Sequence, residues 1–186
     1  CALKMFSQKG FKVAFTYLNS EAEALSLAEK YNALAIKADS SSSAQITDAI
    51  ALASKELGHI DVLINNAGIS EFSLFTDITD EMWHKMIDTN LSGAFYASRA
   101  VLPQMINRNN GNIINVSSMW GVKGASVEVC YSAAKASVIG FTKALAKEVG
   151  PSGITVNCIA PGFIDTKMNS HLDEDSVREI VEATPI

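Results

Sequence analysis

The sequence has 186 residues, of which 48% are hydrophobic and 19% are charged, values typical of one globular domain with a sizeable core. Its net charge is −5 at pH 7, and its 15 Lys and Arg residues are scattered along the chain, which argues against a basic stripe for nucleic acid. The apolar runs are far shorter than the ~20 residues that cross a bilayer, and no basic-then-apolar leader opens the chain. We therefore expect a cytoplasmic protein with no nucleic-acid or membrane partner.

Cysteine and histidine spacing argues against disulfides and metal sites. Cys1, Cys130 and Cys158 form no CxxC pair and leave one cysteine over in any disulfide scheme. The three histidines lack the spacing of metal ligands. The sequence thus predicts a reducing compartment and no bound metal.

The first part of the chain alternates between strand and helix. Residues 12–17 form a short apolar run that predicts a strand, and the Ala-rich segment 21–30, opened by Asn19 or Ser20, predicts a helix. A second strand is predicted at residues 33–37.

The same alternation continues along the rest of the chain. Ser42 and Gln45 form a capping box for a helix that ends near Gly58. Then follow a strand at residues 61–65, a helix at 79–108, a strand at 112–117, a helix at 127–149 and a strand at 155–160.

Strands rich in Val, Ile and Ala that alternate with long helices predict a parallel sheet covered by helices on both faces. We expect residues 1–186 to form a single Rossmann-like domain, a three-layer, doubly wound α/β fold. In such sheets ligands bind beyond the carboxyl ends of the strands, so the segments after the strands are the ones to search.

One such segment, Asn65-Asn66-Ala67-Gly68, directly follows the third predicted strand. Small residues let a ligand approach the backbone, and Asn side chains can tie neighbouring strand ends together. The alternative is a tight turn without further function.

Tyr131 and Lys135 lie four residues apart in a predicted helix and hence on one face of it. An ammonium group near a phenol lowers the phenol's pKa from about 10, so that the Tyr can exchange a proton with a substrate oxygen. The alternative is a Tyr that packs against the core with a hydrated hydroxyl.

Ser118 follows the strand at residues 112–117, where its hydroxyl can reach the phenol and hold a carbonyl oxygen, whereas Ser117 is interpreted as structural. Trp120 flanks the same cleft and either lines a substrate pocket or packs in the core.

Three further positions fit the same edge of the sheet. Asn90 lies inside the long predicted helix, as a relay point or as a surface residue. Pro161-Gly162 follows the last predicted strand as a turn on the ligand edge, and Thr166 can bond an amide or a phosphate.

Taken together and in this order, these motifs closely resemble the short-chain dehydrogenase/reductase family over essentially the whole chain. The motifs are Asn65-Asn66-Ala67-Gly68, Asn90, Ser118, Tyr131-Ser132-Ala133-Ala134-Lys135 and Pro161-Gly162.

The resemblance implies a role for each residue of the site. Tyr131 is the catalytic acid/base, Lys135 lowers its pKa and binds the nicotinamide ribose, Ser118 orients the substrate carbonyl, and Asn90 holds a water of the proton relay. Trp120 lines the substrate pocket. The cofactor-binding residues are Tyr17, Asp39, Asn66, Ala67, Gly68, Tyr131, Lys135, Pro161, Gly162 and Thr166.

The residue at the carboxyl end of the first predicted strand bears on the choice of cofactor. An acid at that place accepts the ribose of NAD and repels the 2′-phosphate of NADP. Tyr17 occupies the place, and no acid precedes Glu21, which favours NADP(H) over NAD(H).

The family's pattern also includes a glycine-rich phosphate turn before the first helix and a final helix and strand. The sequence starts at Cys1, inside what we expect to be that helix, and stops at Ile186. We therefore expect both features to be missing from an incomplete rendering of a longer protein.

Residues 131–168 are most similar to bacterial 3-oxoacyl-[acyl-carrier-protein] reductases, which implies NADPH-dependent reduction of a 3-oxoacyl thioester, as in fatty acid biosynthesis, by a homotetramer or dimer. Residues 68–70, 74–77, 117–121 and 124–126 are also similar to reductases of the 5-aminopentanone modification on elongation factor P. The alternative from another class is a catalytically silent, NADP-sensing protein. A serine hydrolase is disfavoured because no G-x-S-x-G surrounds Ser118.

Overall fold

The computed structural model describes residues 1–164, 166 and 174–182 of the chain. Helices and strands alternate along it, and every strand predicted from the sequence is confirmed with small shifts at its ends. The strands are β1 (Ala14–Tyr17), β2 (Leu34–Lys37), β3 (Val62–Asn65), β4 (Gly111–Val116) and β5 (Ile154–Ile159). The α-helices are α1 (Ala2–Gln8), α2 (Glu21–Tyr31), α3 (Ser43–Leu57), α4 (Asp80–Ile87), α5 (Gly93–Arg108), α6 (Trp120–Lys123), α7 (Val129–Val149) and α8 (Glu174–Glu182).

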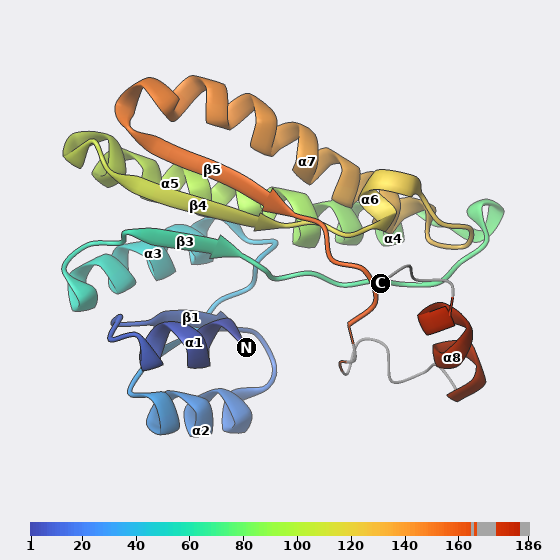
Figure 1. Cartoon of the computed structure of the whole chain (residues 1–186), viewed down its shortest axis with the longest axis horizontal. Coiled ribbons are helices and arrows are strands. Elements are labelled where there is room, and N and C mark those ends of the chain that lie inside the picture. Colours follow the sequence, from blue (N-terminus) through green and yellow to red (C-terminus); the bar gives the residue numbers. More distant parts are fainter. Residues whose placement is uncertain (165, 167–173, 183–186) are drawn as a thin grey trace.

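All strand pairs are parallel, as predicted, but the strands form two sheets. β1 pairs with β2, and β3, β4 and β5 pair in that order. The prediction of one continuous sheet is therefore corrected: over residues 1–164, no strand lies between β1 and β3 to join them by backbone hydrogen bonds. The two sheets lie one beside the other in Figure 1.

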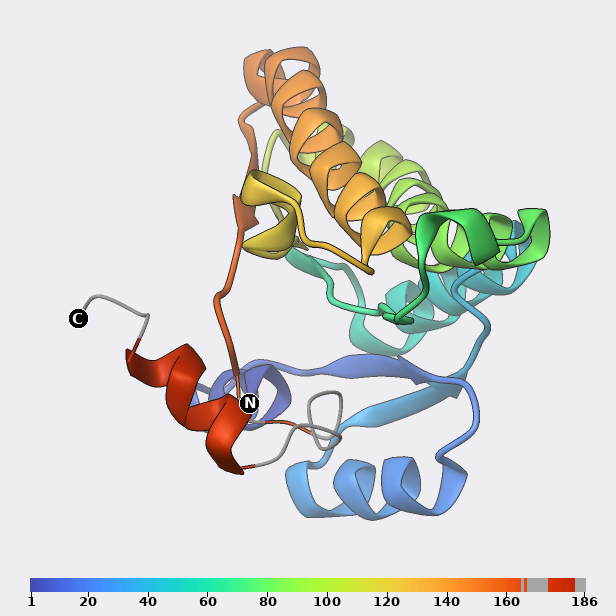
Figure 2. The same ribbon diagram turned by 90° about the vertical axis from the view of Figure 1, so that its right-hand side faces the viewer.

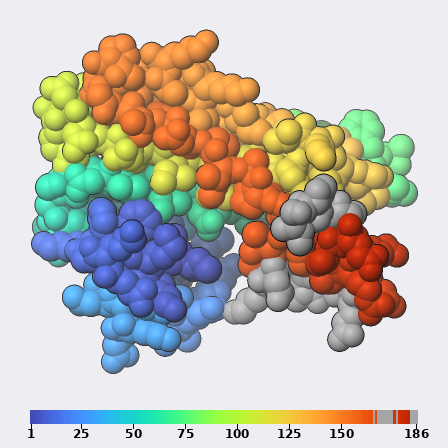
Figure 3. Space-filling model, in the orientation of Figure 1, coloured from blue at the N-terminus to red at the C-terminus, as the bar shows by residue number. Residues whose placement is uncertain are grey.

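The helices form layers on both sides of the strands. Helices α3, α5 and α7 lie together on one side, and α1 and α2 lie on the other (Figures 1 and 2). Helix α3 contacts both β1 and β2, so it bridges the two-stranded sheet and α5. In the space-filling view, the N-terminal segment in blue packs directly against the teal segment that contains α3 and β3 (Figure 3). The arrangement is a single Rossmann-like α/β domain.

The main core lies between the strands and this helical layer. Along β4, buried and partly exposed residues alternate, and Ile113 points into the core with no exposed surface. Val101 and Met105 of α5 are equally buried against it. Each side chain of this size contributes about 1.5–3 kcal/mol on full burial, so the core holds β4 and α5 in a fixed relation.

Side chains cap two helices where the sequence places them. Ser42 Oγ accepts a hydrogen bond from Gln45 N at 3.4 Å, and Thr79 Oγ1 accepts one from Met82 N at 3.2 Å. The side chain of Gln45 reaches back to Asp39 N, at 2.9 Å, and so ties the loop after β2 to the start of α3.

The long helix predicted at residues 79–108 is confirmed as one unbroken helical run, but it is not α-helical throughout. It is divided into α4, a π-helical segment η2 (Asp88–Ser92) and α5. Within η2, the buried Asn90 donates from Nδ2 to Met86 O at 3.0 Å, so its side chain competes with the backbone for that carbonyl group. Segments of π-helix are often found at functional sites.

Over the described residues, no helix is both long and apolar enough to cross a membrane. In the same part of the chain, no group of three or more His, Cys, Asp or Glu side chains is arranged to hold a metal ion.

Candidate active site

The carboxyl edge of the three-stranded sheet gathers the segments that follow its strands. Two backbone hydrogen bonds join the segments after β4 and β5: Ser117 N donates to Ile159 O at 2.8 Å, and Met119 N donates to Pro161 O at 2.9 Å. The start of α7 lies at the same edge, because α7 packs against α6, β4 and β5. Residues that are far apart in the sequence therefore meet here.

Tyr131 lies in the first turn of α7 and is 9% exposed. Burial raises the pKa of its phenol above the usual 10.0, and the charge of Glu128 adds to the rise. Ser118 lies beside the phenol, and the hydrogen bond between the two side chains acts in the opposite direction on this pKa. The phenol therefore keeps its proton at neutral pH.

Lys135, one turn further along α7, is 4% exposed. Its Nζ donates to Val116 O at 2.9 Å, at the carboxyl end of β4. Burial lowers the pKa of this ammonium group from 10.5 to about 8, while the charge of Cys158 acts to raise it. One hydrogen bond uses one of the three ammonium protons, so two donors remain for a ligand.

In this structure burial raises the pKa of Tyr131, and the lowering of this pKa by Lys135 stays a prediction. Lys135 Nζ lies 5.7 Å from the centre of the Tyr131 ring, so the two side chains share a face of α7 as expected. However, the ammonium group is bonded to Val116 O, and burial of the phenol is the larger influence.

Asn90 is 3% exposed, so the alternative of a surface Asn is wrong. Its Oδ1 accepts from Ile69 N at 3.2 Å and its Nδ2 donates to Ile69 O at 3.0 Å, which binds η2 to the segment after β3. A Cβ at Gly68 would lie 2.6 Å from Asn90 Oδ1 and 3.2 Å from Lys135 Nζ. Glycine at this place is what lets the Asn and the Lys approach the backbone.

A buried chain of hydrogen bonds supports the strand ends from below. Asn65 Nδ2 donates to Asn115 Oδ1 at 2.8 Å and to Ser98 Oγ at 3.2 Å. Asn115 Nδ2 donates in turn to Thr142 Oγ1 at 2.8 Å. The sequence pattern predicts the role of Asn65 in joining strand ends but misses Asn115, Ser98 and Thr142. The available signal was an Asn at an inward-facing place of the apolar strand β4, which needs a polar partner.

Residues around Ser118 connect β4 to α7. Ser117 Oγ donates to Lys135 O at 2.7 Å, which agrees with its interpretation as a structural residue. Trp120 N donates to Ser118 Oγ at 3.2 Å, and the Trp120 side chain packs against the cluster that contains Tyr131 and Met86. Trp120 is thus partly buried and packs beside the site, so it combines core packing with a place next to the expected substrate pocket.

The other predicted residues lie at the ends of strands or in the segments that follow them. Tyr17 ends β1, and Asp39, just after β2, accepts from Ser41 N at 2.8 Å and from Ser41 Oγ at 2.7 Å. Pro161 is partly exposed after β5. The exposed positions are Asn66, Ala67, Gly162 and Thr166.

A buried phenol beside a hydroxyl and a buried ammonium group, at the carboxyl edge of a parallel sheet, defines the class of Rossmann-like oxidoreductases. The chain belongs to the short chain dehydrogenase family, whose profile matches residues 1–177. Membership implies a nicotinamide cofactor and an oxidoreductase that acts on ketone and alcohol groups.

Curated relatives support this assignment. The chain is 39% identical over 192 residues to the 3-oxoacyl-[acyl-carrier-protein] reductase of Chlamydia muridarum, a match that covers 98% of this chain and 76% of the relative. It is 40% identical over 178 residues to the acetoacetyl-CoA reductase of Shinella zoogloeoides, covering 95% and 74%. The 3-oxoacyl-[acyl-carrier-protein] reductase of Escherichia coli is 45% identical over 130 residues, which covers 70% of this chain and 53% of that protein.

Proposed function

We propose that this chain reduces a ketone to a secondary alcohol with NADPH, the ketone being a 3-oxoacyl thioester, free or attached to a carrier protein. The single observation that carries the proposal is the protonated, buried phenol of Tyr131 with the Ser118 hydroxyl beside it and the Lys135 ammonium group one turn away. The relatives named for 3-oxoacyl and acetoacetyl substrates supply the substrate class.

The residues of the site divide the work as follows. The Ser118 hydroxyl donates a hydrogen bond to the carbonyl oxygen and fixes its position. Tyr131 then donates the phenolic proton to the same oxygen as negative charge develops there, a step that general acids accelerate by about 10²–10⁴-fold. Burial raises the pKa of the phenol, so Tyr131 carries the proton at neutral pH that the reduction consumes. Asn90 belongs to the relay that returns a proton to Tyr131.

The polar groups present fit a nicotinamide dinucleotide. Lys135 has two unused N–H donors for the ribose hydroxyls, and the missing side chain at Gly68 lets Asn90 and Lys135 lie against the backbone there. When bound, the cofactor supplies the hydride. Tyr17, in place of an acid at the end of β1, favours the 2′-phosphate of NADP(H). The other residues we propose around the cofactor are Asp39, Asn66, Ala67, Pro161, Gly162 and Thr166, with Trp120 on the substrate side.

The remaining expectations complete this proposal. The enzyme is cytoplasmic and assembles with copies of itself through helices α5 and α7, in keeping with the exposed Phe95, which stacks edge-on with Phe141 at 6.5 Å between ring centres.

A second candidate substrate is the 5-aminopentanone group on elongation factor P. Its amino group is a cation, and two carboxylates lie near the site: Glu128 is 7% exposed just before α7, and Glu71 lines a small pocket with Val129 and Cys130. The charge of Glu71 also contributes to raising the pKa of Cys130.

The experiment is to follow NADPH absorbance with acetoacetyl thioester, in the parent protein and in Tyr131→Phe. We expect turnover in the parent and a loss of at least ~100-fold in kcat in the variant, because only the phenolic proton is removed. Tyr96→Phe is the matched control, since Tyr96 of α5 packs against the main core, whereas Tyr131 belongs to a separate cluster. Equal activity in Tyr131→Phe would disprove the role of Tyr131.

Two further outcomes separate the alternatives. Turnover only with elongation factor P that carries the 5-aminopentanone group identifies the second substrate. NADPH binding without turnover of any ketone identifies a sensing protein, and no binding of NADPH or NADH refutes the cofactor assignment.

A further inference from the structure

Helix α6 touches α7 through a glycine. A Cβ at Gly121 would lie 2.7 Å from the backbone carbon of Lys135, 2.8 Å from Lys135 O and 2.7 Å from Ser117 Oγ. Real Cβ atoms essentially never approach other atoms this closely, and two of the three atoms belong to backbone that cannot rotate away. Only glycine therefore allows α6 and α7 to lie this close together.

The contact joins the two halves of the candidate active site. Gly121 N donates to Ser118 O at 2.9 Å, so the glycine is bonded to the residue whose hydroxyl lies beside Tyr131. On the other side of the contact, Ser117 Oγ donates to Lys135 O at 2.7 Å. Lys135 Nζ donates to Val116 O at 2.9 Å, so the backbone and the side chain of this lysine are both held by the end of β4.

Ser118 lies just before α6, whereas Tyr131 and Lys135 lie in α7. The distance between these two helices therefore sets the distance between the reacting groups. We propose that Gly121 and Ser117 are positioning residues, which hold Ser118 at the working distance from Tyr131 and Lys135 in the proposed reduction. This inference rests on the proposed function and adds to it two residues that touch neither substrate nor cofactor.

The expected size of the effect follows from the geometry. Ordinary contact begins at 3.4 Å, so a methyl group at residue 121 must move α6 away from α7 by about 0.7 Å from the present 2.7 Å. A displacement of ~1 Å at a catalytic group can lower a rate by about 100-fold. We therefore expect Gly121→Ala to lower kcat by about 10- to 100-fold.

Gly140→Ala is the matched control. Gly140 lies in α7 and is exposed, and a Cβ there would meet nothing within 4 Å. The same chemical change is thus made in the other helix of the contact without a clash, and it should leave kcat unchanged and stabilise α7 slightly.

A second measurement does not depend on turnover. The rate at which an amine-acylating reagent labels Lys135, followed by mass spectrometry as a function of pH, reports the pKa of this group, which is about 8 in the present packing. If Gly121→Ala separates α6 from α7, water reaches Lys135 and the midpoint of labelling moves upward toward 10.5. Gly140→Ala should keep the parent midpoint.

The outcomes are distinguishable. A folded Gly121→Ala protein with unchanged kcat and an unchanged labelling midpoint overturns the inference. If Gly121→Ala does not fold, Ser117→Ala replaces it: loss of the bond to Lys135 O should lower kcat several-fold and move the midpoint, and no change in either overturns the inference. If the parent turns over no ketone, the proposed function fails. The pH midpoints of Lys135 labelling in the parent and the variants then test by themselves whether Gly121 keeps Lys135 in place.

Discussion

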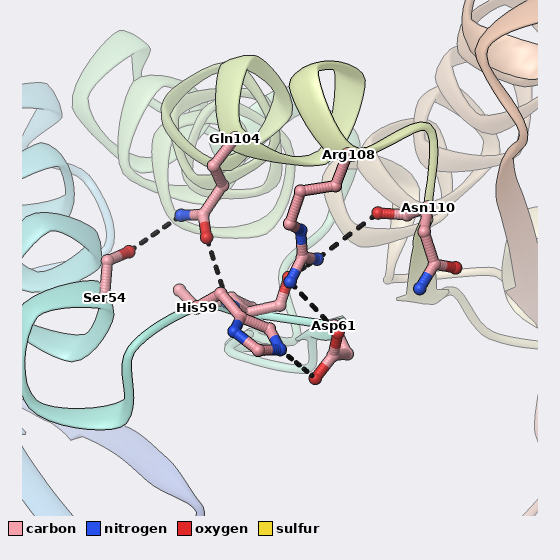
Figure 4. Close-up of polar contacts among 7 residues, drawn as sticks. Ser54, His59, Asp61, Gln104, Arg108 and Asn110 are labelled. Atoms are coloured by element: carbon pink, nitrogen blue, oxygen red, sulfur yellow. Dashed lines mark hydrogen bonds and ion pairs between the residues drawn. The ribbon is translucent and has the colours of Figure 1, made fainter.

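The two ends of the three-stranded sheet carry polar networks of opposite character. At the amino end, Figure 4 shows Asp61 between Arg108 and His59, with O–N distances of 3.2 and 3.3 Å. At the carboxyl end, Asn115 and Lys135 are 0% and 4% exposed and bonded to buried partners. The side chain of Asp61 is 43% exposed.

The difference follows from the cost of leaving water. Exposed ion pairs contribute about 0–1 kcal/mol, so the amino-end network tolerates loose geometry. A buried polar group without a partner costs about 1–3 kcal/mol, so the carboxyl-end network holds its members in one arrangement. In this sheet the end with the rigid network is the one that carries the candidate active site.

The distinction between the two ends of the sheet predicts that Asn115→Ala strongly lowers the free energy of unfolding. The substitution removes the acceptor of Asn65 Nδ2 and the donor to Thr142 Oγ1, both in the interior. We expect a loss of about 3 kcal/mol in the free energy of unfolding, measured by urea denaturation. Asn157→Ala is the control, since Asn157 is an exposed Asn of the neighbouring strand β5. A loss in Asn115→Ala no larger than in the control contradicts the account of a rigid carboxyl end.

The pH dependence of the free energy of unfolding tests the burial of Lys135 at the carboxyl end of the sheet. The pKa of Lys135 is lowered from 10.5 to about 8 by burial, so the native protein loses this proton at a lower pH than the unfolded chain. The unfolded state then binds more protons between these values, and stability rises with pH across this window. We expect the free energy of unfolding to rise by about 2 kcal/mol more in the parent than in Lys135→Met between pH 7.5 and ~10.5, a value reduced to account for partial hydration of the group. Unfolding curves recorded across this pH range measure the difference.

Lys143→Met is the control for this measurement, because Lys143 is an exposed lysine of the same helix. The parent and the control should show the same rise with pH, and Lys135→Met should lack it. A rise that persists in Lys135→Met would assign the pH dependence to other groups.

The smallest effect is expected at the amino end. Asp61→Asn weakens the pairs with Arg108 and His59, and we expect a loss below ~1 kcal/mol, which 1 M salt removes. Gln104, which bonds Ile60 N at 2.9 Å and Ser54 Oγ at 2.7 Å, keeps this end of the sheet in place in the variant (Figure 4). A loss as large as that of Asn115→Ala would remove the distinction between the two ends.

Local patterns were enough to predict the elements and most of the site. The alternation of apolar strands and long helices predicts parallel pairing, and spacing alone places Tyr131 and Lys135 on one face of α7. The motif order predicts the family, which the comparisons confirm. Short-range chemistry of this kind is contained in residue types a few positions apart.

Other features depend on contacts between segments that are distant in the sequence. Asn90 in the π-helical segment bonds Ile69, 21 residues earlier, and Gly121 of α6 lies directly against the backbone of Lys135 in α7. The raised pKa of Tyr131 depends on how completely the fold buries the phenol. The sequence by itself thus determined which groups are available for chemistry, whereas the tertiary structure decided their distances, burial and protonation, because these depend on packing between residues far apart in the chain.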